Sequence, residues 1–334
     1  MNSYKRYMNT LQGKPVDFLP RTPILMQYAA EYSGASYAEF AAAYQVLTLA
    51  NIECARHFGI DQLSCISDPY RETHGFGGKI TYVPDGPPRC SHPLEAQKNL
   101  SVLDLPDPHR SERMLDRILA VREYRRKYNL DYSVLGWVEG PAAEAADLRN
   151  VMNFLTDLID DEPFSAELMD LCLHTALDFA RAQIEAGADT IGIGDAIASQ
   201  ISPAMYERVV QPREKKLVQA IHKMGAKVKL HICGNITHLL PGISDLGVDI
   251  LDVDHMVDMC RVRETVGDKV TLSGNLDPVS VIKNGTPDQI KKAFRRLYKE
   301  VGNPYMVNAG CEIPSGTPQE NLQALCEPIP FLPG

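Results

Sequence analysis

The chain has 334 residues, of which 44% are hydrophobic, and its formal net charge is −9. This composition is typical of a folded protein with a large core, and the acidic balance argues against nucleic acid or an anionic membrane as a partner, because both require a clustered basic surface. No stretch approaches the roughly 20 apolar residues that span a bilayer, and no apolar run follows the basic residues near the start, so we expect neither membrane insertion nor a secretory signal.

The first third of the chain mixes regular elements with a long loop. Residues 22–26 are predicted to form the first strand, residues 37–57 its helix, and residues 62–67 the second strand. Residues 72–110 are rich in proline and glycine, which predicts loops with a small hairpin near residues 79–83.

From about residue 130, short apolar runs alternate with long amphipathic ones. We predict strands at residues 132–138, 189–193, 227–232, 248–253, 269–273 and 305–308, and helices at residues 164–185, 203–224 and 237–246, with further helices after the last two strands. Strands that alternate with helices of this length indicate parallel βαβ units.

The predicted strands are centred near residues 24, 64, 135, 191, 230, 251, 271 and 306. Eight parallel strands with helices between them favour a closed barrel over an open sheet. We therefore predict the α/β class, as a single (β/α)8 TIM-type barrel with an N-terminal extension. One domain over residues 1–334 is expected, because no linker interrupts the pattern.

Polar residues follow nearly every predicted strand, at the carboxyl ends where such barrels carry their active sites. We expect catalytic roles for Glu139, Asp195 and His255, which follows Asp254. The residues expected to bind substrate are Gln27, Tyr28, Asp68, Tyr70, Asn275 and Asn308. Strands also end in polar residues for structural reasons. The presence of a polar residue after nearly every strand is therefore stronger evidence for an active site than any single residue.

The eight cysteines are scattered along the chain, which predicts thiols in a reducing compartment and a cytoplasmic protein. Two of them suggest a metal site. Strand alternation places His231 and Cys233 on one side of a strand end, and Cys311 follows the last strand. Strand ends converge at one rim of a barrel, so these three side chains can reach one ion, although both cysteines can equally be buried core residues.

An imidazole and two thiolates are ligands that zinc accepts, and three protein ligands leave one tetrahedral position for a substrate. Such a soft site binds a thiol and holds it as the thiolate, a nucleophile suited to accepting a methyl group. The same position can activate a water or polarise a substrate oxygen, and the ligands alone do not decide between these chemistries.

Four blocks of sequence, residues 15–24, 66–68, 273–278 and 314–318, together resemble the uroporphyrinogen decarboxylase superfamily over essentially the whole chain. This resemblance implies one (β/α)8 barrel with its active site at the carboxyl rim. Decarboxylases of the superfamily carry arginine after the first strand, whereas residues 26–32 here contain none, which argues against an acidic tetrapyrrole as substrate.

The pattern His-x-Cys with a distant Gly-Cys is similar to the methylcobamide:coenzyme M branch and to related corrinoid-linked methyltransferases of that superfamily. The likeness implies that His231, Cys233 and Cys311 are zinc ligands and that a thiol fills the fourth position. It also implies that the methyl group comes from methylcobalamin. The chain has no segment that resembles a cobalamin-binding module, so a separate corrinoid protein is the expected partner.

Three other readings stay open. In the first, the zinc polarises a methoxy or similar donor, and the methyl group moves to cob(I)alamin. In the second, the chain is a decarboxylase-type tetrapyrrole enzyme without metal. In the third, zinc stabilises a non-catalytic barrel, with Glu139, Asp195 or His255 as a fourth protein ligand.

Overall fold

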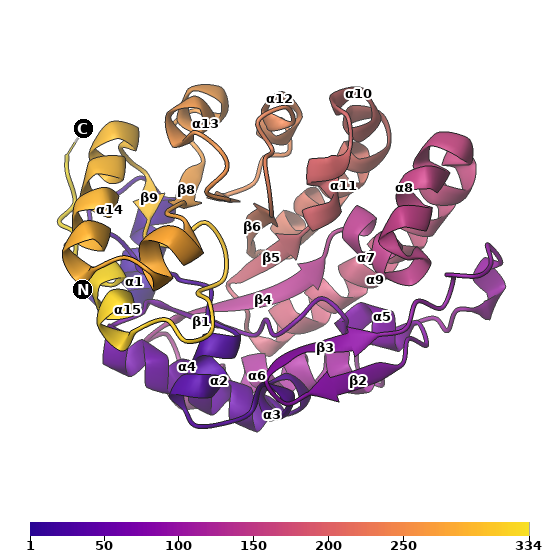
Figure 1. Ribbon diagram of the computed structural model, residues 1–334, viewed down its shortest axis with the longest axis horizontal. Coiled ribbons are helices and arrows are strands. Elements are labelled where there is room, and N and C mark those ends of the chain that lie inside the picture. Colours follow the sequence, from indigo (N-terminus) through magenta and orange to yellow (C-terminus); the bar gives the residue numbers. More distant parts are fainter. Residues whose placement is uncertain (334) are drawn as a thin grey trace.

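The computed structural model describes residues 1–333, and a curved parallel sheet lies at its centre with helices around it (Figure 1). Seven strands pair in the order β1-β4-β5-β6-β7-β8-β9. Their bounds are β1 Gln62–Ser64, β4 Ser133–Glu139, β5 Thr190–Gly194, β6 Lys227–Ile232, β7 Ile250–Val253, β8 Thr271–Gly274 and β9 Tyr305–Met306. Seven of the eight predicted strands are therefore confirmed.

The eighth place in the barrel is taken by residues 20–24, which are extended but form no regular strand. The amide of Thr22 donates to the carbonyl of Val307 at 2.8 Å, beside β9, and the amide of Asp61, beside β1, donates to the carbonyl of Arg21 at 2.8 Å. The segment thus joins the two edges of the sheet. Its two prolines lack an amide hydrogen and cannot extend a ladder, so the predicted strand at residues 22–26 is wrong as a regular element.

Helices follow most of the strands and cover the outside of the sheet (Figure 1). The α-helices are α1 Ser3–Leu11, α2 Gln27–Tyr32, α3 Tyr37–Ala42, α4 Tyr44–Phe58, α5 Arg71–Gly75, α6 Glu112–Tyr128, α7 Pro141–Arg149, α8 Val151–Asp160, α9 Glu162–Ala186, α10 Pro203–Met205, α11 Gln211–Lys223, α12 Leu240–Ser244, α13 Met259–Val266, α14 Pro287–Val301 and α15 Gln319–Leu325. Short 3-10 turns, η1 Leu100–Val102 and η2 Ala196–Gln200, and π-helical turns, η3 Tyr206–Val210 and η4 Pro278–Lys283, complete the set. None of the described helices is both long and apolar enough to cross a membrane.

The predicted helices are mostly confirmed, with three differences. The helix expected at residues 37–57 is divided into α3 and α4, because Ala43 between them is extended at φ −134° and ψ 118°. The helix expected at residues 203–224 contains the π-helical turn η3, and α12 is shorter than the expected residues 237–246. The hairpin near residues 79–83 is present as β2 (Ile80–Val83) and β3 (Gly86–Cys90).

The sheet presents different side chains to its two faces, as strand alternation requires. In β6, Val228, Leu230 and Ile232 are fully buried in the large core between sheet and helices. The intervening Lys229 and His231 lie on the inner face, where both approach the Asp252 carboxylate of β7. Apolar residues of the inner face form a separate small cluster, which consists of Ile24, Ile66, Leu135 and Trp137.

Helix α1 closes the amino end of the barrel. Its Tyr7 is fully buried with Ile250 and Met306, and the Tyr7 hydroxyl lies 2.9 Å from the hydroxyl of Thr190. The predicted N-terminal extension therefore covers the amino ends of the strands, on the side of the barrel opposite the predicted metal ligands.

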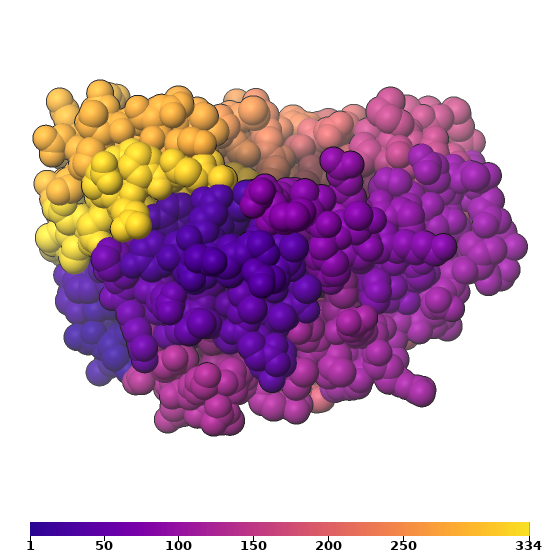
Figure 2. All heavy atoms as spheres, turned by 60° about the horizontal axis from the view of Figure 1, so that its bottom comes forward, coloured from indigo at the N-terminus to yellow at the C-terminus, as the bar shows by residue number. Residues whose placement is uncertain are grey.

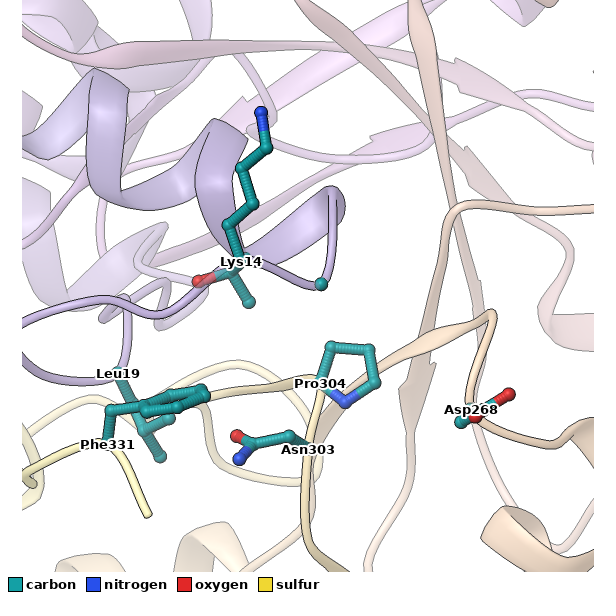
Figure 3. Close-up of a pocket in the computed structure, with 8 residues that line it drawn as sticks. Lys14, Leu19, Asp268, Asn303, Pro304 and Phe331 are labelled. Carbon is teal, nitrogen blue, oxygen red and sulfur yellow. The ribbon is translucent and has the colours of Figure 1, made fainter. Parts of the chain in front are cut away.

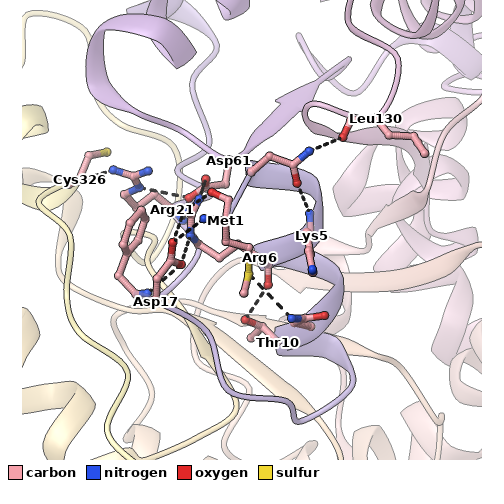
Figure 4. Close-up of polar contacts among 12 residues, drawn as sticks. Met1, Lys5, Arg6, Thr10, Asp17, Arg21, Asp61, Leu130 and Cys326 are labelled. Carbon is pink, nitrogen blue, oxygen red and sulfur yellow. Dashed lines mark hydrogen bonds and ion pairs between the residues drawn. The ribbon is translucent and has the colours of Figure 1, made fainter.

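Ion pairs, most of them buried, hold this N-terminal segment against the barrel (Figure 4). The carboxylate of Asp61, which has no exposed surface, accepts from the guanidinium of Arg6 at 2.5 Å and from the amide and Nε of Arg21 at 2.8 and 3.1 Å. Arg6 also donates to Asp17 at 2.7 Å. Both arginines of the network thus anchor the N-terminal segment to the loop that precedes β1.

The two ends of the chain meet on one side of the molecule. The amide of Leu19 donates to the carbonyl of Ile329 at 2.9 Å, and Figure 2 shows the last segment against the first on the surface. A cavity of about 210 Å³ lies nearby, at the amino ends of β8 and β9 (Figure 3). Its lining residues are Thr10, Gly13, Lys14, Leu19, Asp268, Asn303, Pro304 and Phe331. In barrels of this kind the chemistry takes place at the opposite rim.

Candidate metal centre and cavity

Three predicted ligands meet at the carboxyl rim. His231 is the last residue but one of β6 and faces inward, Cys233 follows the strand directly, and Cys311 lies in the loop after β9. The His231 Nε2 atom lies 3.2 Å from the Cys233 sulfur and 3.7 Å from the Cys311 sulfur, and the two sulfurs are 3.8 Å apart. The barrel therefore brings together residues that are far apart in sequence, as predicted.

The spacing of these atoms fits a zinc ion. Zinc bonds of roughly 2.0–2.3 Å at tetrahedral angles place two sulfurs about 3.8 Å apart and a sulfur and a nitrogen about 3.6 Å apart. The observed triangle has sides of 3.2, 3.7 and 3.8 Å. In the described part of the chain, this group of potential metal ligands contains no fourth member, so Glu139, Asp195 and His255 lie outside it.

A carboxylate orients the histidine. The Nδ1 atom of His231 lies 3.1 Å from the Oδ2 atom of Asp252, which leaves Nε2 directed at the two sulfurs. Asp252 in turn accepts from the side-chain amide of Asn308 at 2.8 Å and lies 3.3 Å from the ammonium of Lys229. All three supporting residues are buried, and carboxylates in this position commonly fix the orientation of a metal-binding imidazole.

Neighbouring groups shift the pKa values of two of the three side chains. Burial disfavours the imidazolium, but the neighbouring Cys233 and Asp252 outweigh burial and raise the pKa of His231 well above its usual value. Hydrogen bonds from Cys233 and His231 lower the pKa of Cys311 to about 4. The three side chains thus favour a thiolate beside a cation, which is the charge arrangement that a divalent metal also stabilises.

A cavity of about 140 Å³ opens beside the three ligands on the inner face of the barrel. Aliphatic and aromatic side chains form most of its wall. The lining residues are Ile24, Met26, Ile66, Asp68, Pro69, Trp137, Glu139, Gly194, Ala196, His231, Cys233, Cys311 and Glu312. A cavity of this volume suits a small molecule.

One wall of the cavity is the indole of Trp137, the single tryptophan of the chain. The ring lies across two glycines of the neighbouring strand β5. A Cβ atom at Gly192 would approach the ring to 2.2 Å, and one at Gly194 to 3.0 Å. Because an added methyl group has no space at Gly192, the Gly-x-Gly spacing of this strand is explained by contact with the indole.

Two predicted carboxylates reach the cavity, each held by a buried arginine. Glu139 accepts from Arg71 at 2.6 Å and from the indole nitrogen of Trp137 at 3.2 Å. Asp68 accepts two bonds from Arg113, at 2.8 and 2.6 Å. Burial raises the pKa of Glu139 well above its usual value although Arg71 opposes the shift, whereas Arg113 outweighs burial and lowers the pKa of Asp68.

Asp195 lies elsewhere. It is fully buried, and its carboxylate accepts from the amides of Ala142 at 3.4 Å and Ala143 at 2.7 Å at the start of α7. Burial raises the pKa of Asp195 to about 7. The structure therefore places this residue at a helix N-terminus, outside the cavity lining.

The other predicted residues surround the site or lie behind it. Tyr28 packs against Tyr32 and Phe58 in the core, and Gln27 donates to the carbonyl of Asp85. Asn275 donates to the carbonyls of Asp254 and Val257, which supports the loop after β7. None of Gln27, Tyr28, Tyr70, Asn275, Asn308 and His255 belongs to the cavity lining.

Two of these residues nevertheless have defined partners near the rim. The Nδ1 atom of His255 lies 2.9 Å from Asp254, and its Nε2 atom lies 3.6 Å from Asp277. The amide of Tyr70 donates to Asp68 at 3.0 Å. His255 is about one third exposed, so it lies at the open face of the rim.

Sequence reasoning missed Asp252, Trp137, Arg71 and Glu312. Asp252 interrupts the apolar run of β7, which is a signal that the sequence does offer. The carboxyl of Glu312, next to Cys311, accepts from the amide of Gln27 at 2.8 Å and lines the cavity. Neither its position in a loop nor its residue type predicts that contact.

A curved parallel sheet with three potential metal ligands and a cavity at its carboxyl rim is typical of enzymes of the TIM-barrel class. The uroporphyrinogen decarboxylase (URO-D) family matches residues 2–329. The chain is 30% identical to the methylcobamide:CoM methyltransferase MtbA of Methanosarcina mazei, over 97% of this chain and 96% of that protein. It is 25% identical to the uroporphyrinogen decarboxylase of Geobacter sulfurreducens, over 96% of this chain and 97% of that protein.

A solved structure described as a methyltransferase from Methanosarcina mazei has the same fold, with a TM-score of 0.88, 25% identity and 97% of both chains covered. This confirms the predicted barrel. The chain belongs to the uroporphyrinogen decarboxylase family. Its methyltransferase relatives assign it as a methyltransferase, as the resemblance implied.

Proposed function

We propose that this protein transfers a methyl group between a corrinoid protein and a small thiol that zinc activates. The observation that carries the proposal is the triangle of His231, Cys233 and Cys311, whose sides of 3.2, 3.7 and 3.8 Å fit tetrahedral zinc at the edge of a cavity. The corrinoid partner is inferred from relatives whose names specify methylcobamide as a substrate.

Bound zinc would supply a thiolate at neutral pH, because a free thiol with a pKa near 8.5 is mostly protonated there. The residues of the chain would position this thiolate and shield it from water. Asp252 keeps the Nε2 atom of His231 directed at the sulfurs, and the apolar wall formed by Ile24, Ile66 and Trp137 excludes water. Attack of sulfur on a methyl group requires in-line geometry, so orientation within the cavity contributes directly to the rate.

The cavity also argues against tetrapyrrole decarboxylation. Its volume of about 140 Å³ suits a small molecule, and its lining contains no arginine or lysine among the described residues. A substrate with many carboxylates requires cations, because buried anions without partners are strongly disfavoured. The two nearby arginines, Arg71 and Arg113, already bind Glu139 and Asp68.

Free methylcobalamin tests the proposal without the corrinoid partner. Zinc-loaded protein with 2-mercaptoethanol is expected to convert methylcobalamin and thiolate into cob(I)alamin and the methyl thioether in equal amounts, under anaerobic conditions. Absorbance follows the corrin, and mass spectrometry identifies the thioether. A Cys311→Ser variant is expected to lose this activity. If neither 2-mercaptoethanol nor a charged analogue of it is methylated, the proposed thiol acceptor is wrong.

The reverse direction uses the same residues, with a methyl donor in the cavity and cob(I)alamin as acceptor. Incubation of the protein with cob(I)alamin and methylated compounds, including a methyl thioether and a methoxy compound, separates the two directions. Formation of methylcobalamin from the methoxy compound alone would favour the alternative function.

A further inference from the structure

Two cysteine sulfurs lie side by side at the edge of the cavity: those of Cys233 and Cys311 are 3.8 Å apart. Resting on the proposed function, we propose that this pair is also a modification site, at which a small hydroperoxide joins the two sulfurs as a disulfide and thereby releases zinc. An external thiol reverses the change. The pair is thus a redox switch that turns methyl transfer off and on.

The two sulfurs are close enough to form a bond after a small movement. A disulfide has a sulfur–sulfur length of roughly 2.05 Å, so the observed 3.8 Å closes if each sulfur moves by about 0.9 Å. Cys233 follows β6 and Cys311 lies in the loop after β9. Rotation of these side chains about their Cα–Cβ bonds leaves the backbone hydrogen bonds of the sheet intact.

Both sulfurs can be reached by a small oxidant. Cys233 and Cys311 are partly exposed, and both line the cavity of about 140 Å³. Hydrogen peroxide is smaller than any thiol substrate, so a cavity that takes the substrate also admits the oxidant. Zinc ligation holds both sulfurs as thiolates, and the thiolate is the form of cysteine that reacts with peroxide.

The reaction needs one equivalent of hydroperoxide and no other oxidant. One thiolate attacks an oxygen of hydrogen peroxide, so that a sulfur–oxygen bond forms, the oxygen–oxygen bond breaks, and the departing hydroxide takes up a proton to become water. The second thiolate then attacks the sulfur of this sulfenic acid. The disulfide bond forms, and hydroxide leaves and is protonated to water. Two thiolates, one peroxide and two protons thus give one disulfide and two waters.

The disulfide removes two of the three proposed zinc ligands, because its sulfurs are no longer thiolates. His231 is then the single ligand left, which is too few to retain the ion. The neighbouring thiolate also intercepts the sulfenic acid before a second peroxide reaches it. Oxidation therefore stops at a stage that an external thiol can reverse, short of the irreversible sulfinic acid.

The other six cysteines are poorly placed for this reaction. Four of them, Cys54, Cys65, Cys172 and Cys326, are at most 1% exposed. Cys90 and Cys260 are partly exposed but do not line the cavity. Burial raises the pKa of Cys90 to about 12, so the reactive thiolate is rare at that position. Peroxide is therefore expected to act first on the pair at the cavity.

Peroxide treatment of zinc-loaded protein, without any methyl donor, tests the inference. A chromophoric chelator follows zinc release against a sample without peroxide, and peptide mapping without reductant identifies the cysteines that are cross-linked. We expect one zinc released for each disulfide between Cys233 and Cys311, with the same time course, and recovery of zinc binding after dithiothreitol and added zinc. Zinc release without this cross-link, or oxidation of the pair that dithiothreitol does not reverse, would overturn the inference.

Two matched variants, treated as metal-free protein, test whether the pairing of the sulfurs decides the outcome. Cys233→Ser leaves Cys311 without a neighbouring thiol, so peroxide is expected to carry Cys311 on to sulfinic acid, which dithiothreitol does not reverse. Cys260→Ser removes a partly exposed cysteine outside the cavity and should form the same cross-link as wild type. Full reversal by dithiothreitol in Cys233→Ser would show that the second sulfur is not needed and would contradict the inference.

The same samples separate this inference from the proposed function. If the protein takes up zinc and methylates a thiol, but peroxide forms no cross-link between Cys233 and Cys311, the inference is wrong and the proposed function stands. If the protein takes up no zinc, the proposed function is wrong, and peptide mapping of the metal-free protein still decides whether the pair forms a disulfide.

Discussion

Replacing Asp252 with asparagine tests how the barrel positions the proposed metal ligand His231. The Oδ2 atom of Asp252 lies within ion-pair distance of the Nδ1 atom of His231, at 3.1 Å. An asparagine has similar size but no charge. Loss of such a supporting carboxylate typically weakens metal binding by about 10- to 100-fold, which corresponds to roughly 1.4–2.7 kcal/mol.

The same substitution affects stability for a separate reason. Lys229 is 2% exposed and has Asp252 as its ion-pair partner at 3.3 Å. Breaking a buried pair by removal of one partner typically destabilises a protein by about 3–5 kcal/mol, because the other charge stays buried without compensation. Asp252→Asn is therefore expected to lower both the affinity for zinc and the stability of the apoprotein.

A second variant separates the two effects. The double variant Asp252→Asn with Lys229→Met removes both charges, so it should recover most of the stability while the zinc affinity stays low. Denaturant unfolding of the apoprotein measures stability, and competition with a chromophoric chelator measures zinc affinity. Wild-type affinity in Asp252→Asn, or affinity that recovers together with stability in the double variant, would refute the role of Asp252 in orienting His231.

Three further predictions concern the rest of the molecule. Asp61→Asn removes the carboxylate shared by two buried arginines and should lower the free energy of unfolding by about 3–5 kcal/mol in denaturant titrations; a loss below 1 kcal/mol would contradict the anchoring role of the network. Asp68 has a pKa held below its usual value by Arg113, so its stabilisation is present above the unfolded pKa of about 3.9 and is lost as the pH falls further. The stability difference between wild type and Asp68→Asn should accordingly shrink as the pH is lowered from 6 to 3, and a constant difference would contradict the pairing. Gly192→Ala should displace the indole of Trp137, shift its fluorescence and weaken thiol binding, whereas an unchanged spectrum would contradict the contact.

Much of the barrel was predictable because its strands are mostly short apolar runs that alternate with longer amphipathic segments. The strand at residues 22–26 was not, because Pro23, and Pro20 just before it, cannot donate to a regular ladder, while tertiary contacts still hold the segment in the eighth place. Sequence pattern alone does not show that bridging role.

The meeting of the three potential metal ligands was predictable for a similar reason. His231 and Cys233 alternate onto one face of a strand, and Cys311 follows the strand that closes the sheet. The contacts of the other polar side chains were harder to predict from the sequence. Asp195 and Asn275 follow strands as expected, yet they satisfy backbone groups of α7 and of the loop after β7, because those buried amides and carbonyls require partners.

The carboxylate that supports His231 was missed because it belongs to the neighbouring strand. Register places Asp252 of β7 beside His231 of β6, and such pairing between strands becomes visible only when the sheet is assembled. The same holds for Trp137, whose cavity wall depends on Gly192 in the strand beside it.

Zinc content is the most direct test of the central claim that His231, Cys233 and Cys311 form a metal centre. The measurement is elemental analysis of protein reconstituted with zinc and then dialysed, for wild type and for His231→Ala. We predict about one zinc per wild-type chain and a loss of that zinc in the variant. Wild-type protein that retains no zinc, or a variant that retains as much as wild type, would contradict the account.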